Sequence, residues 1–356
     1  MNHPLWTLRD DEVGAYYEER VLAWLGWDLE SAPVNELASA YRQLSEQLNR
    51  SAGAAPSGEF AGKADLAVRA LVYGWRSVFV ARRLLRGGSG VLVELGSGLG
   101  PFGLVAGAAG RPVRLVDAAS KILEEAPDFF AAFDVEAPTL VRGDMSKHLD
   151  EGGEAVLPYS ALEWAGSSGA RRDRLVRALR SGRLLIVERG TKEGGAFVQG
   201  LRDGVQGRVG GPCPERSTCA LAERPKDWCH FTWSVRPGPL TQRISDKAGR
   251  RWNALHVSWV RSGSPGPDGV VLWKRPEGKR KLVVGVCTWG GLERWVSERR
   301  DREATEALEE LESGDRVRRE GGEMRGDGVR VRSHGEVRRV AAIGDVGVGT
   351  RAVDDL

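Results

Sequence analysis

The stretch that decides the fold is Val91-Leu92-Val93-Glu94-Leu95-Gly96-Ser97-Gly98-Leu99-Gly100. Its first half is a short apolar run typical of a buried strand, and its second half places a glycine at every other position. Glycine lets the backbone take positive φ angles and approach a ligand closely, as in the strand-to-helix turn of nucleotide-binding α/β folds. We therefore expect a Rossmann-like sheet around this turn.

The surrounding sequence alternates between strand-like and helical patterns. Helical periodicity runs from residue 11 to 85 and predicts an N-terminal helical module. After the glycine-rich turn, helical segments separate further short apolar runs at 112–116, 139–141, 155–157 and 184–187. This alternation predicts an α/β fold with a mostly parallel sheet covered by helices on both faces.

The character of the chain changes after Gly190, where glycine, proline and tryptophan increase. Short β-like runs at 256–260 and 281–287 predict a β-rich module, and we expect no long helix there before a charged candidate at 302–312. The sequence predicts four parts: an N-terminal helical module (1–88), a Rossmann-like domain (89–200), a cysteine-containing module (201–314) and a basic tail (315–356), either β-like or disordered.

Composition bounds the class of protein. The chain has 356 residues, a formal net charge of +3 and four cysteines, too few for a disulfide scaffold. It begins without a basic segment followed by an apolar run, and no stretch has the roughly 18 apolar residues of a membrane span. We expect a soluble, cytoplasmic monomer with no membrane partner.

Polar residues at successive strand ends predict a cofactor site. Glu94 precedes the glycines, and a carboxylate at Asp117, which ends the next strand, would accept hydrogen bonds from both ribose hydroxyls of an adenosine cofactor. Asp144 and Met145 follow the third strand, where adenine would lie, and Tyr159 follows the fourth. The predicted S-adenosylmethionine site comprises Glu94, Gly96, Ser97, Gly98, Gly100, Asp117, Asp144, Met145 and Tyr159.

Two alternatives remain for the turn. Gly98-Leu99-Gly100-Pro101-Phe102-Gly103 also matches the dinucleotide fingerprint, and the turn could be purely structural. Glu94 suits the cationic amino group of S-adenosylmethionine, a cofactor without a pyrophosphate that requires a helix N-terminus. We therefore favour S-adenosylmethionine.

The four cysteines form a second pattern. Cys213, Cys219 and Cys229 are clustered in a glycine- and proline-rich stretch, and Cys287 follows at the end of an apolar run. Three clustered ligands and one distant ligand can close a thiolate site, which either zinc or an iron–sulfur cluster accepts. The alternative is four separate buried cysteines that behave as small apolar residues.

The cysteine stretch resembles that of the Rsm-type mitochondrial small-subunit ribosomal assembly proteins and their methyltransferase-like relatives. The resemblance rests on Pro212-Cys213-Pro214, Cys219-Ala220-Leu221, Asp227-Trp228-Cys229-His230-Phe231, Cys287-Thr288 and the Glu188-Arg189-Gly190-Thr191 turn. It implies a class I methyltransferase sheet and a [4Fe–4S] cluster held by Cys213, Cys219, Cys229 and Cys287, with zinc as the alternative. It also implies small-subunit rRNA or a ribosomal assembly intermediate as partner.

Basic clusters at 171–183, 274–281 and 316–339 would neutralise RNA phosphates, although each alone also fits an ordinary solvated face.

Three hypotheses follow: an rRNA-binding assembly factor that keeps both cofactors as structural or sensing ligands, an rRNA methyltransferase, and a methyltransferase for a small molecule. The sequence assigns no catalytic residue, so whether the protein is an enzyme stays open.

Overall fold

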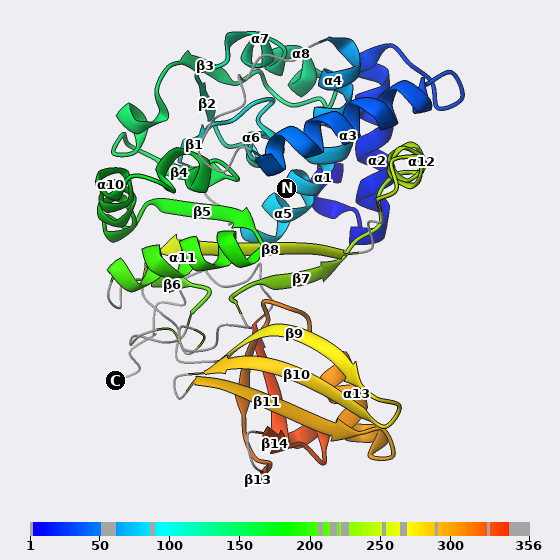
Figure 1. The fold of residues 1–356 in the computed structure, drawn as a ribbon, viewed down its shortest axis with the longest axis vertical. Coiled ribbons are helices and arrows are strands. Elements are labelled where there is room, and N and C mark those ends of the chain that lie inside the picture. Colours follow the sequence, from blue (N-terminus) through cyan, green and yellow to red (C-terminus); the bar gives the residue numbers. More distant parts are fainter. Residues whose placement is uncertain are drawn as a thin grey trace.

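The computed structural model describes residues 3–50, 62–85, 90–205, 209–213, 219, 221, 228–250, 254–263, 269–288, 291–325 and 328–341. These residues form a larger body built on one sheet and a smaller module built on a second sheet below it (Figure 1). Residues 51–61 and the part of the predicted basic tail beyond residue 341 lie outside the described residues.

The first sheet has the strand order β3-β2-β1-β4-β5-β8-β6, and β7 also pairs with β8. The first five are mutually parallel, while β8 runs antiparallel to β5, β6 and β7. This order, with β1 at the point where the sheet reverses direction, is that of a doubly wound Rossmann-like sheet. The predicted fold class is therefore confirmed. The strands are β1 (Leu92–Leu95), β2 (Val113–Asp117), β3 (Thr139–Arg142), β4 (Glu154–Pro158), β5 (Leu184–Arg189), β6 (Val209–Gly211), β7 (Phe231–Ser234) and β8 (Ala254–Ser262).

Helices cover both faces of this sheet, as the alternation predicted. One face packs against the N-terminal helices and α6–α8, and the other packs against α9–α11. The first group is α1 (Pro4–Thr7), α2 (Asp10–Leu25), α3 (Val34–Arg50), α4 (Lys63–Val68), the π-helical η1 (Arg69–Gly74), α5 (Trp75–Leu84), α6 (Pro101–Ala108), α7 (Ser120–Glu124) and α8 (Ala126–Ala131). The second is α9 (Ala161–Ala165), α10 (Gly169–Arg180) and α11 (Lys192–Val205). The short η2 (Met145–His148) follows β3, and α12 (Pro239–Lys247) packs beside α3.

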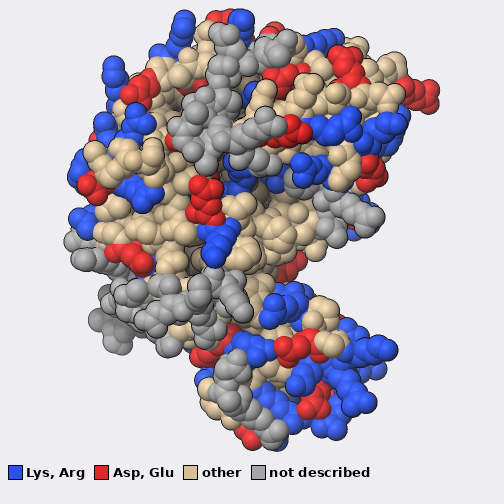
Figure 2. All heavy atoms as spheres, viewed as in Figure 1, with Lys and Arg blue, Asp and Glu red and all other residues tan. Residues whose placement is uncertain are grey.

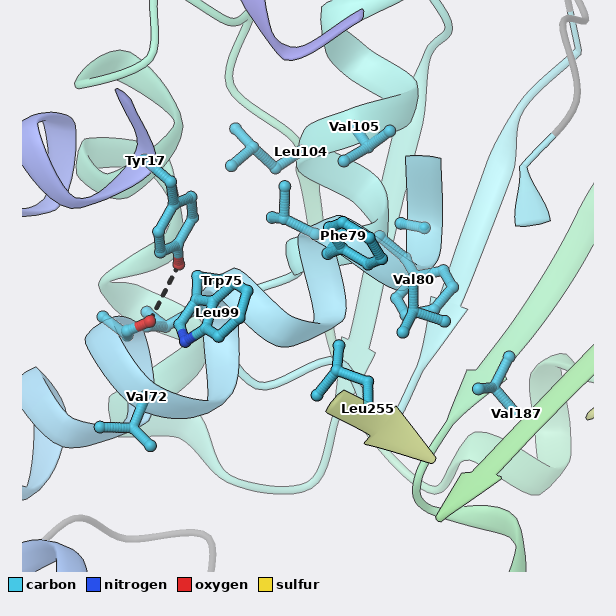
Figure 3. Close-up of a cluster of buried hydrophobic side chains, with 14 of the residues drawn as sticks. Tyr17, Val72, Trp75, Phe79, Val80, Leu99, Leu104, Val105, Val187 and Leu255 are labelled. Atoms are coloured by element: carbon cyan, nitrogen blue, oxygen red, sulfur yellow. Dashed lines mark hydrogen bonds between the residues drawn. The ribbon is translucent and has the colours of Figure 1, made fainter. Parts of the chain in front are cut away.

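The period-two pattern of the strands explains this two-sided core. In β5, Leu185 and Val187 belong to the cluster with the N-terminal helices, whereas Leu184 and Ile186 belong to the opposite cluster. Figure 3 shows the first cluster, in which the Tyr17 hydroxyl of α2 donates a hydrogen bond of 3.1 Å to the Ala70 carbonyl. That bond joins α2 to the π-helical turn η1 within the N-terminal helices.

One expectation about the chain after Gly190 is wrong, because α11 has 14 residues and α12 has nine. The glycines of α11 suggested a loop, but they allow close packing. A Cβ at Gly194 would lie 2.2 Å from the Arg189 carbonyl oxygen, and one at Gly195 would lie 2.8 Å from the Trp228 ring. Phe197 and Leu201 of the same helix are buried against the sheet. Close packing therefore compensates for the low helix propensity of glycine.

The second sheet has the order β13-β14-β11-β10-β9-β12-β15, and α13 (Arg302–Glu309) packs on it. Its elements are β9 (Gly269–Glu277), β10 (Lys281–Thr288), β11 (Gly291–Glu298), β12 (Arg316–Arg319), β13 (Glu323–Arg325), β14 (Gly328–Arg330), η3 (His334–Glu336) and β15 (Val337–Ala341). The chain thus passes from the first sheet to the second between β8 and β9. The sequence instead predicted boundaries after residue 200, before the cysteine-containing module, and after residue 314, before the basic tail. Among the described residues, no helix has the length and hydropathy of a membrane span.

Candidate functional site

The glycine turn lies at the carboxyl end of β1 and has a backbone that only glycine adopts easily. Gly96, Gly98 and Gly100 have φ angles of 66°, 54° and 76°. A Cβ at Gly96 would lie 2.8 Å from Ser160, and one at Gly100 would lie 2.6 Å from Leu115. The turn therefore keeps its shape only with glycines at these positions.

Glu94 connects the end of β1 to the start of α6, on either side of the glycine turn. Its side chain is fully buried and accepts hydrogen bonds from the amides of Gly103 (2.6 Å) and Phe102 (3.4 Å) in the first turn of α6. Burial raises the pKa of Glu94 to about 8, although these hydrogen bonds oppose the shift. The predicted contact between Glu94 and a cofactor amino group stays a prediction, and the structure adds a role in capping α6.

Asp117 ties the end of β2 to the glycine turn. One carboxylate oxygen accepts the Gly98 amide at 2.8 Å, and the other accepts the Ala119 amide at 2.9 Å. The side chain is only half-buried, and each carboxylate oxygen can accept a further hydrogen bond. This arrangement keeps Asp117 available for the ribose contact that the sequence predicts.

The other predicted residues lie on the neighbouring loops. The Gly143 amide donates to the Asp117 carbonyl at 3.0 Å, which brings the loop after β3 next to the end of β2. Asp144 accepts the Ser146 amide at 2.8 Å, and this hydrogen bond lowers the pKa of Asp144. The Met145 methyl group lies 3.7 Å from the position of a Cβ at Gly96. The structure therefore brings these loops to one edge of the sheet, together with Ser97.

Tyr159 follows β4 in an unusual conformation. Its φ angle is 60°, a value that residues other than glycine seldom adopt, and its amide donates to the Val187 carbonyl at 2.7 Å. Burial raises the pKa of Tyr159 to about 12, so the phenol is protonated at neutral pH. Tyr159 can therefore donate a hydrogen bond there.

The sequence analysis missed a cationic and aromatic group beside Tyr159. The Arg76 guanidinium of α5 lies 5.9 Å from the centre of the Tyr73 ring, and the Tyr41 ring lies edge-on to Tyr73 at 5.9 Å. Burial lowers the pKa of Arg76, while the charges of Arg76 and Arg189 oppose the rise in the pKa of Tyr159. The spacing of Tyr73 and Arg76, three residues apart on a helix, was the available signal.

The four cysteines meet at the junction of the two sheets. All four are buried and none forms a disulfide. Burial raises the pKa of Cys229 well above its usual value, and repulsion from Cys213, Cys219 and Cys287 adds to the shift. Cys213 follows β6, Cys229 precedes β7, and Cys287 lies on β10 of the second sheet. The fold therefore brings Cys287 near the other three cysteines, although it lies far from them in the sequence.

Two buried arginines flank this group. Burial raises the pKa of Cys213 to about 11, and the nearby charges of Arg202 and Arg316 oppose the rise. In the described part of the chain, no three His, Cys, Asp or Glu side chains are arranged to hold a metal ion. The two arginines place positive charge beside the buried thiols, which favours the thiolate form of Cys213.

Comparison with known proteins gives one family. Residues 156–318 match the family model of "Mitochondrial small ribosomal subunit Rsm22", so the resemblance seen in the sequence is confirmed over that stretch. A search of curated proteins found no match.

Solved structures with similar folds include several methyltransferases. A putative RNA methyltransferase from Pyrococcus horikoshii is 14% identical, with a TM-score of 0.34 over 64% of this chain and 100% of that one. Magnesium protoporphyrin IX methyltransferase from Synechocystis PCC 6803 is 13% identical, with a TM-score of 0.34 over 65% and 99%. An rRNA methylase from Streptococcus thermophilus is 13% identical, with a TM-score of 0.30 over 53% and 95%.

The pKa of Glu94 generates a stability prediction. The carboxyl group binds a proton more tightly in the folded chain, with a pKa of about 8, than at its ordinary value of 4.5. Its contribution to stability is therefore fully present below pH 4.5 and is lost as the pH rises through 8. Urea unfolding at a series of pH values should show this loss, and Glu94→Gln should reduce it.

The matched control is Glu124→Gln on α7, which replaces an exposed carboxyl group. This control should keep the pH dependence of the unmodified protein. Glu188, whose pKa burial raises to about 7, remains in both variants, so the Glu94→Gln dependence should shrink without vanishing. An unchanged dependence in Glu94→Gln would show that Glu94 is not a buried, neutral acid near pH 7.

Proposed function

We propose, from the match of residues 156–318 to the Rsm22 family, that this chain binds S-adenosylmethionine and acts on small-subunit rRNA or a ribosomal assembly intermediate. The cofactor would lie at the carboxyl ends of β1 to β4. Gly96, Ser97, Gly98 and Gly100 would line its path, with Asp117 at the ribose and Asp144 with Met145 near the adenine. When bound, it supplies an activated methyl group.

The observation that carries this proposal is the position of Glu94. A dinucleotide places its pyrophosphate on free amides at a helix N-terminus. Here Pro101 has no amide hydrogen, and Glu94 already accepts the next two amides of α6. A pyrophosphate would have to displace the buried carboxyl group of Glu94, whereas S-adenosylmethionine has no phosphate to place. The turn therefore favours S-adenosylmethionine over a dinucleotide.

Asp117→Ala should weaken S-adenosylmethionine binding by about 1–3 kcal/mol, because charge-assisted hydrogen bonds to the ribose would be lost. Titration calorimetry on the full chain measures this change. Asp173→Ala, which removes an exposed carboxylate from α10, is the control and should leave the affinity unchanged. Equal affinities in the two variants would contradict the placement of the ribose at Asp117.

Methyl transfer is the second part of the proposal. Labelled S-adenosylmethionine should transfer its methyl group to purified small-subunit rRNA, and the transfer should fall in Asp117→Ala in proportion to cofactor occupancy. If rRNA binds but takes up no label, the protein is an assembly factor that uses the cofactor as a structural ligand. Label only on a small molecule would favour the alternative substrate class.

We also infer that Cys213, Cys219, Cys229 and Cys287 hold a [4Fe–4S] cluster. The charges of Cys213, Cys219 and Cys287 act on Cys229, which places the four side chains in one group. Four thiolates can hold either zinc or an iron–sulfur cluster. The resemblance of the cysteine stretch to the Rsm-type proteins favours the cluster.

Cys287→Ser should remove as much iron from anaerobically purified protein as Cys219→Ser, because both sheets must contribute ligands to close the site. Iron analysis and limited proteolysis measure the two effects, and both variants should expose the region after Gly190 to protease. Thr288→Ser on the same strand is the control. Full iron content in Cys287→Ser would rule out the four-cysteine site.

The cytoplasmic location and monomeric state remain predictions from the sequence.

A further inference from the structure

The β9–β10 hairpin extends beyond the core of the second sheet. Residues 274–281 are all exposed, although the strands stay paired as far as Glu277 and Lys281. Hydrophobic burial therefore does not account for this part of the hairpin. Pro276 is the one apolar side chain among residues 274–281.

Positive charge gathers on this projection without local compensation. The basic tip consists of Arg275, Lys279, Arg280, Lys281 and Arg299, because the Arg299 amide donates to the Arg280 carbonyl at 2.7 Å and brings β11 to the hairpin. No member of the basic tip has an ion-pair partner among the described residues. Figure 2 shows Lys and Arg gathered over this end of the smaller module.

The neighbouring acids are already engaged. Glu277 pairs with Arg294 at 2.7 Å. Glu298 pairs with Arg300 at 2.7 Å and with Arg330 at 3.3 Å. These carboxylates neutralise other arginines, so the basic tip keeps its positive charge.

Trp273 of β9 lies beside the basic tip and contacts the Arg275 guanidinium. A Cβ at Gly285 would lie 2.4 Å from the Trp273 ring, so one face of the ring packs on the strand backbone. The Arg275 guanidinium lies 4.5 Å from the ring centre and covers that ring. Trp273 is therefore not a platform for stacking bases, and the surface offers cations alone.

We infer that the basic tip of the β9–β10 hairpin binds the phosphate backbone of a double-stranded RNA segment. Exposed cations without stacking rings recognise phosphates and duplex shape, with little dependence on sequence. A membrane surface is disfavoured, since Pro276 is the one apolar side chain of residues 274–281 and no aromatic or large aliphatic side chain there can enter the lipid boundary. This inference rests on the proposed rRNA partner and adds the contact surface, which lies outside the cofactor edge.

The test uses the full chain carrying Lys279→Ala, Arg280→Ala and Lys281→Ala together. Fluorescence anisotropy with a mixed-sequence RNA duplex should show binding weakened about tenfold or more. The slope of log affinity against log salt should fall by about 2–3, because each lost phosphate contact removes close to one unit. S-adenosylmethionine affinity, measured on the same samples, should not change.

The matched control is Arg302→Ala, which removes an exposed arginine of the same module that is paired with Glu306 at 2.8 Å. It should bind RNA like the unmodified protein. Unchanged affinity and salt slope in the triple variant would overturn the hairpin surface and leave the proposed function standing. No RNA binding by the unmodified chain would overturn both. Tighter binding to phosphatidylserine vesicles than to RNA, lost in the triple variant, would replace RNA with a membrane.

Discussion

The pairing of β8 with three other strands is the constraint on which the rest of the structure depends. One edge of β8 pairs with β5, and its other edge is shared by β7 at one end and β6 at the other. The chain that carries Cys213, Cys219 and Cys229 leaves β6 and returns through β7, so both ends of this loop are fixed on one strand. The Ser258 hydroxyl of β8 also donates to the Cys229 carbonyl at 2.6 Å. An antiparallel strand added to a parallel sheet thus positions the cysteines.

Strand β8 also connects the predicted S-adenosylmethionine edge with the group of four cysteines. In the body, β5 ends at Arg189 and β4 ends at Pro158, just before Tyr159 of the predicted methyl-donor edge. On the side of the smaller module, two hydrogen bonds join β7 to Ser313. The Trp233 indole donates to the Ser313 carbonyl oxygen at 2.6 Å, and the Thr232 amide donates to the Ser313 hydroxyl at 3.0 Å. A group bound by all four cysteines would cross-link this junction, so its binding energy would be folding energy for the contact between sheets. The proposed RNA surface would then be held at a fixed distance from the cofactor edge.

Much of the body was predictable because its signals are local. The glycine turn requires positive φ angles, and the strands alternate between two buried faces, so both are visible in the sequence. The helix α11 was not predictable from the sequence. Its glycines allow close contacts with Arg189 and Trp228, and these contacts exist only in the folded chain. The capping of α6 by Glu94 and the cluster around Arg76 likewise depend on elements that meet through tertiary packing. The site residues predicted from strand ends share one edge of the sheet, but their roles toward a ligand remain to be measured.

The central claim is that S-adenosylmethionine binds at the carboxyl ends of the parallel strands. Hydrogen–deuterium exchange of the full chain, with and without the cofactor, tests it most directly. The account predicts slower exchange on cofactor addition in residues 94–100, 117–119 and 143–146. Unchanged exchange in these three segments at saturating cofactor, or protection confined to other parts of the chain, would contradict it.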